Sequence, residues 1–188
     1  MSILRSATDP RWVGIALSDL DRTLGDHAHC ERKAAATALK LVGDHPSEAD
    51  LVRPLARLAR EESEHFFAVL NELSHRGVHL PRDEGDPYAQ GLLRLVRPGA
   101  PRLLDRLLVG ALIEARSCER LALLGEALPA GRLRDLYRRL AVAEGGHERL
   151  LVDLAVARGG AAAEARLPAL AGAEAQIVAG LPLAPRIH

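Results

Sequence analysis

The chain has 188 residues, enough for one domain with a real hydrophobic core and too few to divide comfortably into two. Its residues are 48% hydrophobic but only 3% aromatic, and Ala and Leu dominate the apolar share, which favours helices over sheets. The 25 basic and 25 acidic residues balance, so a nucleic-acid partner would have to meet a local patch of charge.

No apolar run approaches the roughly 18 residues that a transmembrane helix needs. The first residues, MSILRSATDPRW, lack the basic start and apolar stretch of a secretory signal. We therefore expect a cytoplasmic protein without a membrane partner. In that reducing compartment Cys30 and Cys118 are expected to be two small buried thiols and not a disulfide.

Four long helices are predicted from apolar residues at helical spacing, at about residues 15–42, 49–75, 101–127 and 132–158. Short turns containing Gly and Pro join the first helix to the second and the third to the fourth, so each pair should form an antiparallel hairpin. A long, proline-rich connection separates the two pairs and has room for a short helix at 88–96. A connection of this length suits the crossover of a ferritin-like bundle.

The remainder of the chain follows two glycines and is rich in Ala and Pro. Residues 161–178 either form a fifth helix or are loosely held. The predicted fold is therefore a single all-α domain over residues 1–188, a ferritin-like four-helix bundle with a long crossover between its second and third helices. Its core should cover about residues 12–158 and its tail residues 159–188.

Two of the predicted helices carry Glu and His three residues apart in the middle of an apolar stripe. Glu62 and His65 interrupt the stripe of the second helix, and Glu144 and His147 interrupt that of the fourth. Residues three apart share one face of a helix, so the carboxylate and imidazole of each pair can reach the same ion.

The first and third helices each place one Glu on an apolar stripe, Glu31 and Glu114. Glu31 precedes Glu62 by 31 residues and Glu114 precedes Glu144 by 30, so each antiparallel hairpin should bring its two carboxylates level. Glu119 precedes Glu144 by only 25 residues and is expected to point elsewhere.

Burial of these charged groups would cost several kcal/mol each unless something neutralised them. Four carboxylates balance two divalent cations, and a set of Glu and His without thiolate favours iron or manganese over a structural zinc. This is the ligand set of ferritin-like di-iron and di-manganese proteins. The predicted metal ligands are Glu31, Glu62, His65, Glu114, Glu144 and His147.

Residues around these ligands carry weaker signals. Gly145 and Gly146 lie inside the fourth helix, where glycine is costly, and a kink or a π-bulge is expected there. Four neighbours of the ligands are expected to be mostly solvated: His27, His29, Glu61 and Glu64. Three aspartates are candidates for orienting metal-bound histidines: Asp26, Asp105 and Asp135.

The chain resembles the bacterial tRNA 2-methylthio-N6-isopentenyladenosine hydroxylases (MiaE) from about Trp12 to the tail. The segments that carry the resemblance are DHAHCERKAA (26–35), LAREESEHF (58–66), VGALIEARSCER (109–120) and YRRLAVAEGGHERLLVDLA (137–155). The IEARSCER and DHAHCERKAA segments are far more specific than the ligand spacing alone. Departures from the family are the Gly145-Gly146 pair and a shortened tail.

The resemblance implies a non-haem di-iron monooxygenase that consumes O2 and two electrons from an external donor. It implies hydroxylation of the isopentenyl group of an adenosine next to the anticodon, with a tRNA anticodon stem-loop and an unidentified electron-transfer protein as partners. Carried over by position, the metal ligands are the same six residues. Phosphate contacts are expected from arginines of the crossover, namely Arg82, Arg94, Arg97 and Arg102.

Other functions share the ligand pattern. A ferroxidase or iron-storage protein would use the same site within a hollow cage. A di-manganese catalase or a rubrerythrin-like peroxidase is a further alternative, although the chain has no cysteine quartet of the rubredoxin kind. A bundle without metal would serve as an interaction module.

Overall fold

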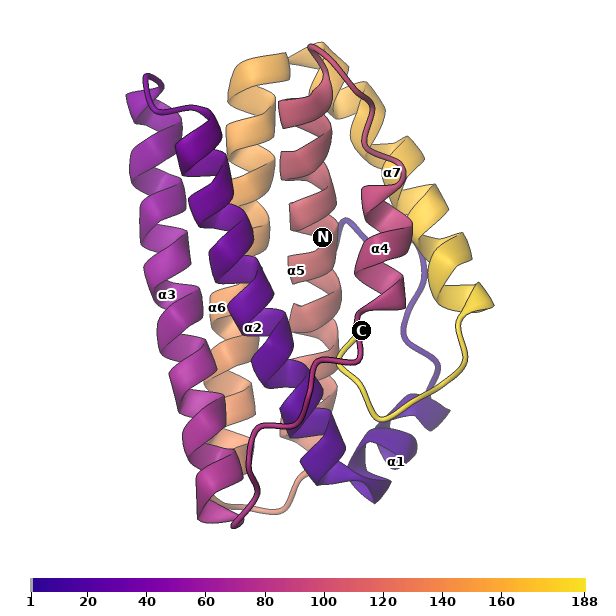
Figure 1. Ribbon diagram of the computed structural model, residues 1–188. Coiled ribbons are helices and arrows are strands. Elements are labelled where there is room, and N and C mark those ends of the chain that lie inside the picture. Colours follow the sequence, from indigo (N-terminus) through magenta and orange to yellow (C-terminus); the bar gives the residue numbers. More distant parts are fainter. Residues whose placement is uncertain (1) are drawn as a thin grey trace. The chain divides into compact units, whose positions relative to one another are not determined.

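The computed structural model describes residues 2–188, and within this range it contains seven helices and no strand (Figure 1). The predicted all-α class is therefore confirmed. The helices are α1 (Arg11–Ser18), α2 (Leu20–Asp44), α3 (Ala49–His75), α4 (Pro87–Leu93), α5 (Arg102–Ala127), α6 (Arg132–Gly159) and α7 (Ala161–Gly180). Among the described residues, none of these helices combines the length and the hydrophobicity that crossing a membrane requires.

The chain forms two compact units. The α2–α3 unit comprises Val13–Glu84 and Ala184–Ile187, and the α5–α6 unit comprises Gly85–Leu183, His188 and the segment that ends at Trp12. Each unit is built around one antiparallel hairpin of two long helices, as the short turns predict (Figure 1).

The α2–α3 hairpin follows the predicted apolar stripes. Leu24 and Ala28 of α2 and Leu51, Leu55 and Val69 of α3 are completely buried. Each buried leucine contributes about 1.5–3 kcal/mol relative to an exposed one. The stripes therefore decide which faces of α2 and α3 are hidden from water.

The first long helix begins later than the predicted range 15–42. Helix α1 ends at Ser18, and the Asp19 side chain accepts a hydrogen bond from the Arg22 backbone N–H at 3.1 Å, which caps α2. Thr23 adds a hydrogen bond from its hydroxyl to the Ala16 carbonyl at 2.8 Å. A side-chain cap offers the backbone an alternative to a continuous helix, and for this reason the range predicted from hydrophobic spacing was wrong at its start.

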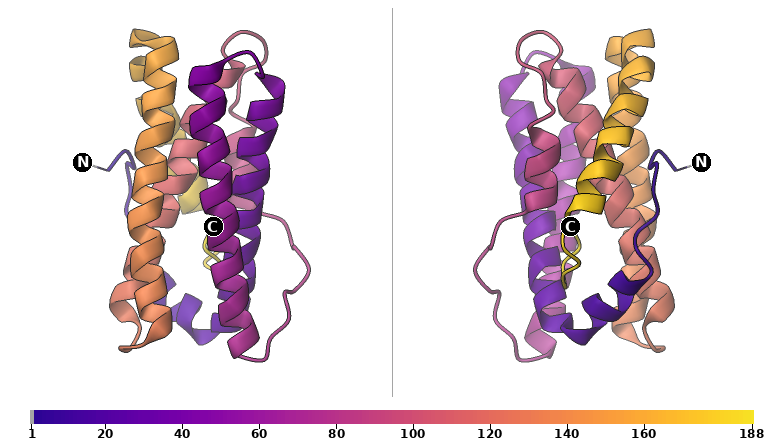
Figure 2. Two further views of the ribbon diagram at one scale, coloured as in Figure 1. Left: turned by 90° about the vertical axis from the view of Figure 1, so that its left-hand side faces the viewer. Right: turned by 90° about the vertical axis from the view of Figure 1, so that its right-hand side faces the viewer.

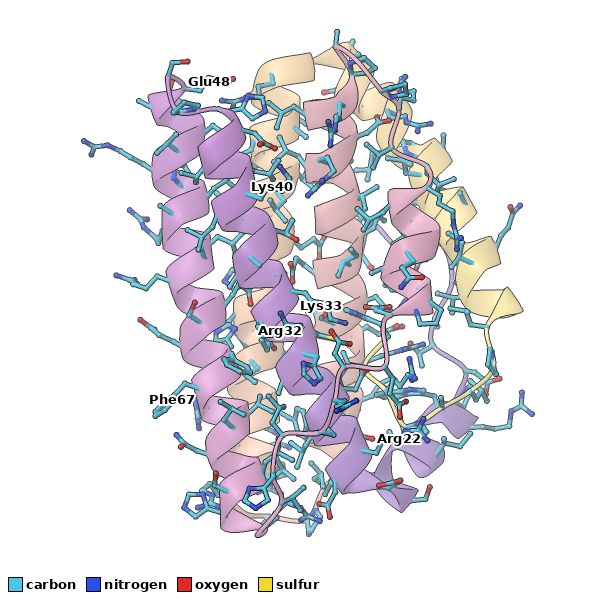
Figure 3. All side chains as sticks on the ribbon, in the orientation of Figure 1. Arg22, Arg32, Lys33, Lys40, Glu48 and Phe67 are labelled. Carbon is cyan, nitrogen blue, oxygen red and sulfur yellow. The ribbon has the colours of Figure 1, made fainter. Side chains whose placement is uncertain are left out.

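The long connection after α3 runs beside α2 (Figure 2), where Arg32 and Lys33 of α2 lie next to it (Figure 3). Asp83 accepts ion pairs from Arg32 and Lys33, each at 3.0 Å. Gly25 of α2 allows Pro81 to approach closely, since a Cβ at Gly25 would lie 2.5 Å from the Pro81 Cγ. The connection is thus held against α2 by ion pairs and by close packing at Gly25.

The α5–α6 unit adds two shorter helices to its hairpin. Helix α4 is capped by the Asp86 side chain, which accepts from the Ala89 N–H at 2.9 Å, and it ends at Leu93, before the predicted limit of residue 96. Of the two alternatives for the tail, the structure has the helix: α7 contacts α4, α5 and α6. A Cβ at Gly91 would lie 3.1 Å from Ile177, which shows how closely α4 and α7 approach.

Arg116 anchors three segments of the α5–α6 unit to one another. It is completely buried and forms a two-pronged ion pair with Glu174 of α7, with N–O distances of 3.0 and 3.1 Å. Its other donors reach Glu119, the Thr8 hydroxyl at 3.1 Å and the Ser6 carbonyl at 3.0 Å. Burial lowers the pKa of Arg116, but the carboxylates of Glu174 and Glu119 outweigh it, so the net pKa is raised and the side chain stays charged.

Candidate metal centre

The α2–α3 hairpin brings together the three ligands predicted from its sequence. Glu31 and Glu62 are buried, and His65 is almost buried. The Nδ1 atom of His65 lies 3.5 Å from Oε2 of Glu62 and 3.7 Å from Oε2 of Glu31. The separation of 31 residues therefore does place the two carboxylates around one imidazole.

His27 is a further member of this group that we expected to be solvated. It is 1% exposed, and its Nε2–H donates to Oε1 of Glu31 at 2.6 Å. The sequence contained the signal, because His27 precedes Glu31 by four residues and so lies on the same buried face of α2. A histidine in this position holds one oxygen of the carboxylate and fixes the orientation of the other.

Of the other three neighbours of the ligands, one is buried and two are at least partly exposed. His29 is also buried, against expectation, because its Nε2–H donates to the Pro81 carbonyl of the connection at 2.9 Å. Glu61 is half-buried and Glu64 is exposed. Neither carboxylate forms part of the Glu31, Glu62 and His65 group.

The α5–α6 hairpin carries the other three predicted ligands. Glu114, Glu144 and His147 are all buried, and the Nδ1 atom of His147 lies 3.3 Å from Oε2 of Glu144. Donor atoms bound to one ion at about 2.0–2.2 Å lie about 3–3.5 Å apart, so each Glu-x-x-His pair has its donors at the separation that a shared ion requires.

A π-bulge, one of the two alternatives predicted at Gly145-Gly146, is not present, since the α-helix continues through both residues. A Cβ at Gly145 would lie 3.4 Å from Sγ of Cys118, so the glycine admits a close approach of α5. Cys118 and Cys30 form no disulfide among the described residues and are only half-buried, less than predicted. Burial and the nearby carboxylates raise the pKa of the Cys118 thiol, which favours its protonated form.

The three candidate aspartates do not contact the predicted histidine ligands. Asp26 accepts from the Ile187 N–H at 2.7 Å, and Asp135 is an exposed neighbour of Arg134. Asp105 is buried and binds Arg97 and Arg166 at 2.7 and 3.1 Å.

Of the acidic residues considered, Glu119 points elsewhere, as predicted. It binds the Thr8 hydroxyl at 2.6 Å and Arg116. All four crossover arginines, Arg82, Arg94, Arg97 and Arg102, are exposed, and Arg97 is engaged by Asp105.

The chemistry of the donors fits a pair of divalent ions. Each hairpin contributes two carboxylates and one imidazole from buried positions and no thiolate, a set that suits iron or manganese. Buried carboxylates in this number are stable as anions only when cations compensate them. The buried Glu and His clusters could therefore hold metal.

Comparison with known proteins identifies relatives over most of the chain. A family model described as tRNA-(MS[2]IO[6]A)-hydroxylase (MiaE) matches residues 1–188. A tRNA 2-(methylsulfanyl)-N(6)-isopentenyladenosine(37) hydroxylase of Pseudomonas putida is 43% identical over 155 residues, covering 82% of this chain and 75% of the relative. The protein of the same name from Salmonella typhimurium is 32% identical over 205 aligned positions, covering 82% of this chain and 76% of the relative.

A solved structure is also similar over the whole chain. It is a protein from Synechococcus with aldehyde deformylating oxygenase activity, with a TM-score of 0.94 and 40% sequence identity. The match covers 100% of this chain and 96% of the other. The helical, ferritin-like fold class predicted from the sequence is therefore confirmed.

Proposed function

Because the chain belongs to the MiaE family of tRNA hydroxylases, we propose that it hydroxylates the isopentenyl group of 2-methylthio-N6-isopentenyladenosine in tRNA. The observation that carries this proposal is the family match over residues 1–188, and the two buried Glu and His clusters supply the chemical means. The enzyme class is that of an O2-dependent oxygenase of the di-iron family.

The proposed cofactor is a pair of iron ions bound by three side chains from each hairpin. The ligands are Glu31, Glu62, His65, Glu114, Glu144 and His147, the donors whose spacing and burial fit such a pair. This arrangement requires the α2–α3 and α5–α6 units to form one domain. When bound, the iron would activate O2 with two electrons from an external protein donor.

The residues of the chain have definable tasks in this reaction. His27 holds Oε1 of Glu31 and so fixes the orientation of Oε2, the oxygen that lies 3.7 Å from Nδ1 of His65. Burial of Glu62 and Glu144 excludes bulk water from the carboxylates and strengthens their interaction with cations. The substrate base must leave its stack to reach side chains buried this deeply.

An anticodon loop meets that requirement, because its bases are already partly unstacked. The proposed partners are therefore the anticodon arm of tRNA and a protein that supplies electrons. Since the substrate is tRNA, we place the protein in the cytoplasm.

Nucleoside analysis of a deletion strain tests the function, in cells known to contain the hydroxylated base. Mass spectrometry of digested tRNA should show the unhydroxylated nucleoside accumulating, and the wild-type gene should restore the product. Glu114→Ala should fail to restore it, whereas Glu64→Ala, an exposed glutamate next to the ligand cluster, should succeed. An unchanged nucleoside profile in the deletion would exclude the tRNA substrate.

A second candidate rests on the similar solved structure, that of a Synechococcus protein with aldehyde deformylating oxygenase activity. The same purified, iron-loaded protein should be offered an aldehyde and a prenylated anticodon stem-loop side by side. Deformylation of the aldehyde, without hydroxylation of the RNA, would favour the second candidate.

A further inference from the structure

The outer face of α3 combines exposed arginines with an exposed aromatic ring. Arg53, Arg57 and Arg60 are exposed, and Phe67 is 64% exposed, pointing away from the hairpin (Figure 3). The chain has only two phenylalanines, and the ring of one of them is therefore exposed to solvent. We call these four residues the α3 outer face.

The four residues lie on one side of α3, and the exposed Glu64 lies within the same arc. On a helix with 3.6 residues per turn they fall within about 80° of arc and span about 21 Å along the axis. By the same geometry Glu62 lies on the opposite side of α3, where it is buried. One helix therefore presents the proposed ligand inward and these four residues outward.

The arginines of the α3 outer face differ from the cations of α2 in their partners. Arg32 and Lys33 are bound to Asp83, and Lys40 is bound to Asp44 at 2.9 Å. Arg53 and Arg57 have no ion pair with any of the described residues 2–188. Helix α3 thus offers two cations, Arg53 and Arg57, that no other described residue pairs with.

Arg60 is the intermediate case. Its guanidinium lies 3.4 Å from Glu64 and 3.7 Å from Glu61, and all three side chains are at least partly exposed. Surface pairs of this kind are worth less than about 1 kcal/mol, so Arg60 can exchange them for a phosphate.

We propose that the α3 outer face docks the anticodon loop of tRNA, with its arginines on backbone phosphates and Phe67 stacked on an unstacked base. The proposal rests on the function proposed above and names the surface that presents the substrate. Loop nucleotides expose both charged phosphates and splayed bases, and proteins bind them with cationic stripes and aromatic platforms. The balanced charge of the whole chain makes such a local patch necessary.

Binding of a fluorescently labelled anticodon stem-loop tests the surface, measured by anisotropy at several salt concentrations with iron-loaded protein. Phe67→Ala should weaken binding about 5- to 150-fold, the value of one base stack. The Arg53→Ala, Arg57→Ala double variant should reduce the slope of log K against log salt by about 1.4, for two phosphates of a single strand. Matched controls on α2 are Leu39→Ala, at a residue 56% exposed, and Lys40→Ala; both should bind like the wild type.

Three further measurements decide between explanations. Iron content and helicity of every variant should equal those of the wild type, and Phe67→Trp should restore binding because a larger ring stacks as well.

Wild-type RNA affinity in Phe67→Ala and in the double arginine variant would overturn the docking surface and leave the proposed function intact. If these variants bind RNA normally and lose only the turnover that the electron-donor protein drives, the RNA-docking surface is also overturned, and the α3 outer face is instead a surface that binds the donor protein. Absence of RNA binding by the wild type would overturn both proposals.

Discussion

Replacing Asp105 with asparagine removes a carboxylate that joins α5 to two arginines. Asp105 accepts hydrogen bonds from the Arg97 backbone and side chain at 2.7–2.9 Å and from the Arg166 side chain at 3.1 and 3.2 Å. Burial of Asp105 disfavours its charged form, but these donors outweigh burial and lower its pKa from 3.8 to about 2. The carboxylate is therefore stabilised by the folded state.

The sign of the pH dependence follows from the lowered pKa. Unfolded chains bind the proton at about 3.8, so the carboxylate contributes its full stability above that pH and loses it as the pH falls toward 2. The difference between the two pKa values corresponds to about 2.4 kcal/mol. Because the Arg97 side chain is 46% exposed, solvent screening reduces the expected contribution to about 1–2 kcal/mol.

Urea unfolding followed by circular dichroism measures this contribution. Asp105→Asn should lower the free energy of unfolding by about 1–2 kcal/mol at neutral pH, and the difference from the wild type should shrink between pH about 4 and 2. Asp135→Asn is the matched control, because Asp135 also lies in the first turn of a long helix but is exposed. Equal effects of the two substitutions, or a difference that persists unchanged at low pH, would refute the reasoning.

Three more predictions follow from single contacts. His65→Ala should lose close to one of two irons per chain in metal analysis of purified protein, and unchanged iron content would remove it from the ligand set. Arg116→Met should cost about 3–5 kcal/mol in urea unfolding, because Glu174 is left buried with an uncompensated charge; a variant as stable as the wild type would contradict this. Gly25→Ala should lower the free energy of unfolding by about 1 kcal/mol in the same assay, since overpacking against Pro81 outweighs the gain in helix propensity. A net gain in stability would show that the connection that carries Pro81 moves aside.

Hydrophobic spacing was sufficient to predict the four long helices. A stripe of Leu and Ala marks the face that must leave water, and that requirement does not depend on the rest of the fold. The break before α2 was missed because it depends on one local hydrogen bond, from the Arg22 N–H to the Asp19 side chain. Helix α7 remained undecided because residues 161–178 are rich in Ala and Pro, and their sequence alone does not show what they pack against.

In the candidate site, too, some features were predictable from the sequence and others were not. The ligand groups were predictable because charged side chains on an apolar stripe need a compensating charge, and in each hairpin the Glu-x-x-His pair does lie close together, at 3.5 Å for Glu62 and His65 and 3.3 Å for Glu144 and His147. The burial of His27 was predictable from its position four residues before Glu31, and we did not use that signal. The pairing of Arg116 with Glu174 was not predictable, since it joins residues 58 apart through the docking of α7.

The IEARSCER segment therefore combines two tasks on one helix of the α5–α6 unit. Glu114 offers a buried carboxylate, while Arg116, two residues later and so on a different side of α5, binds α7 and the N-terminal segment. A metal ligand is useful only if its backbone is held within about 0.5 Å of the productive position. The completely buried ion pair of Arg116 with Glu174 restrains α5 one turn or less from Glu114, which gives the most specific motif of the chain a physical reason to carry both residues.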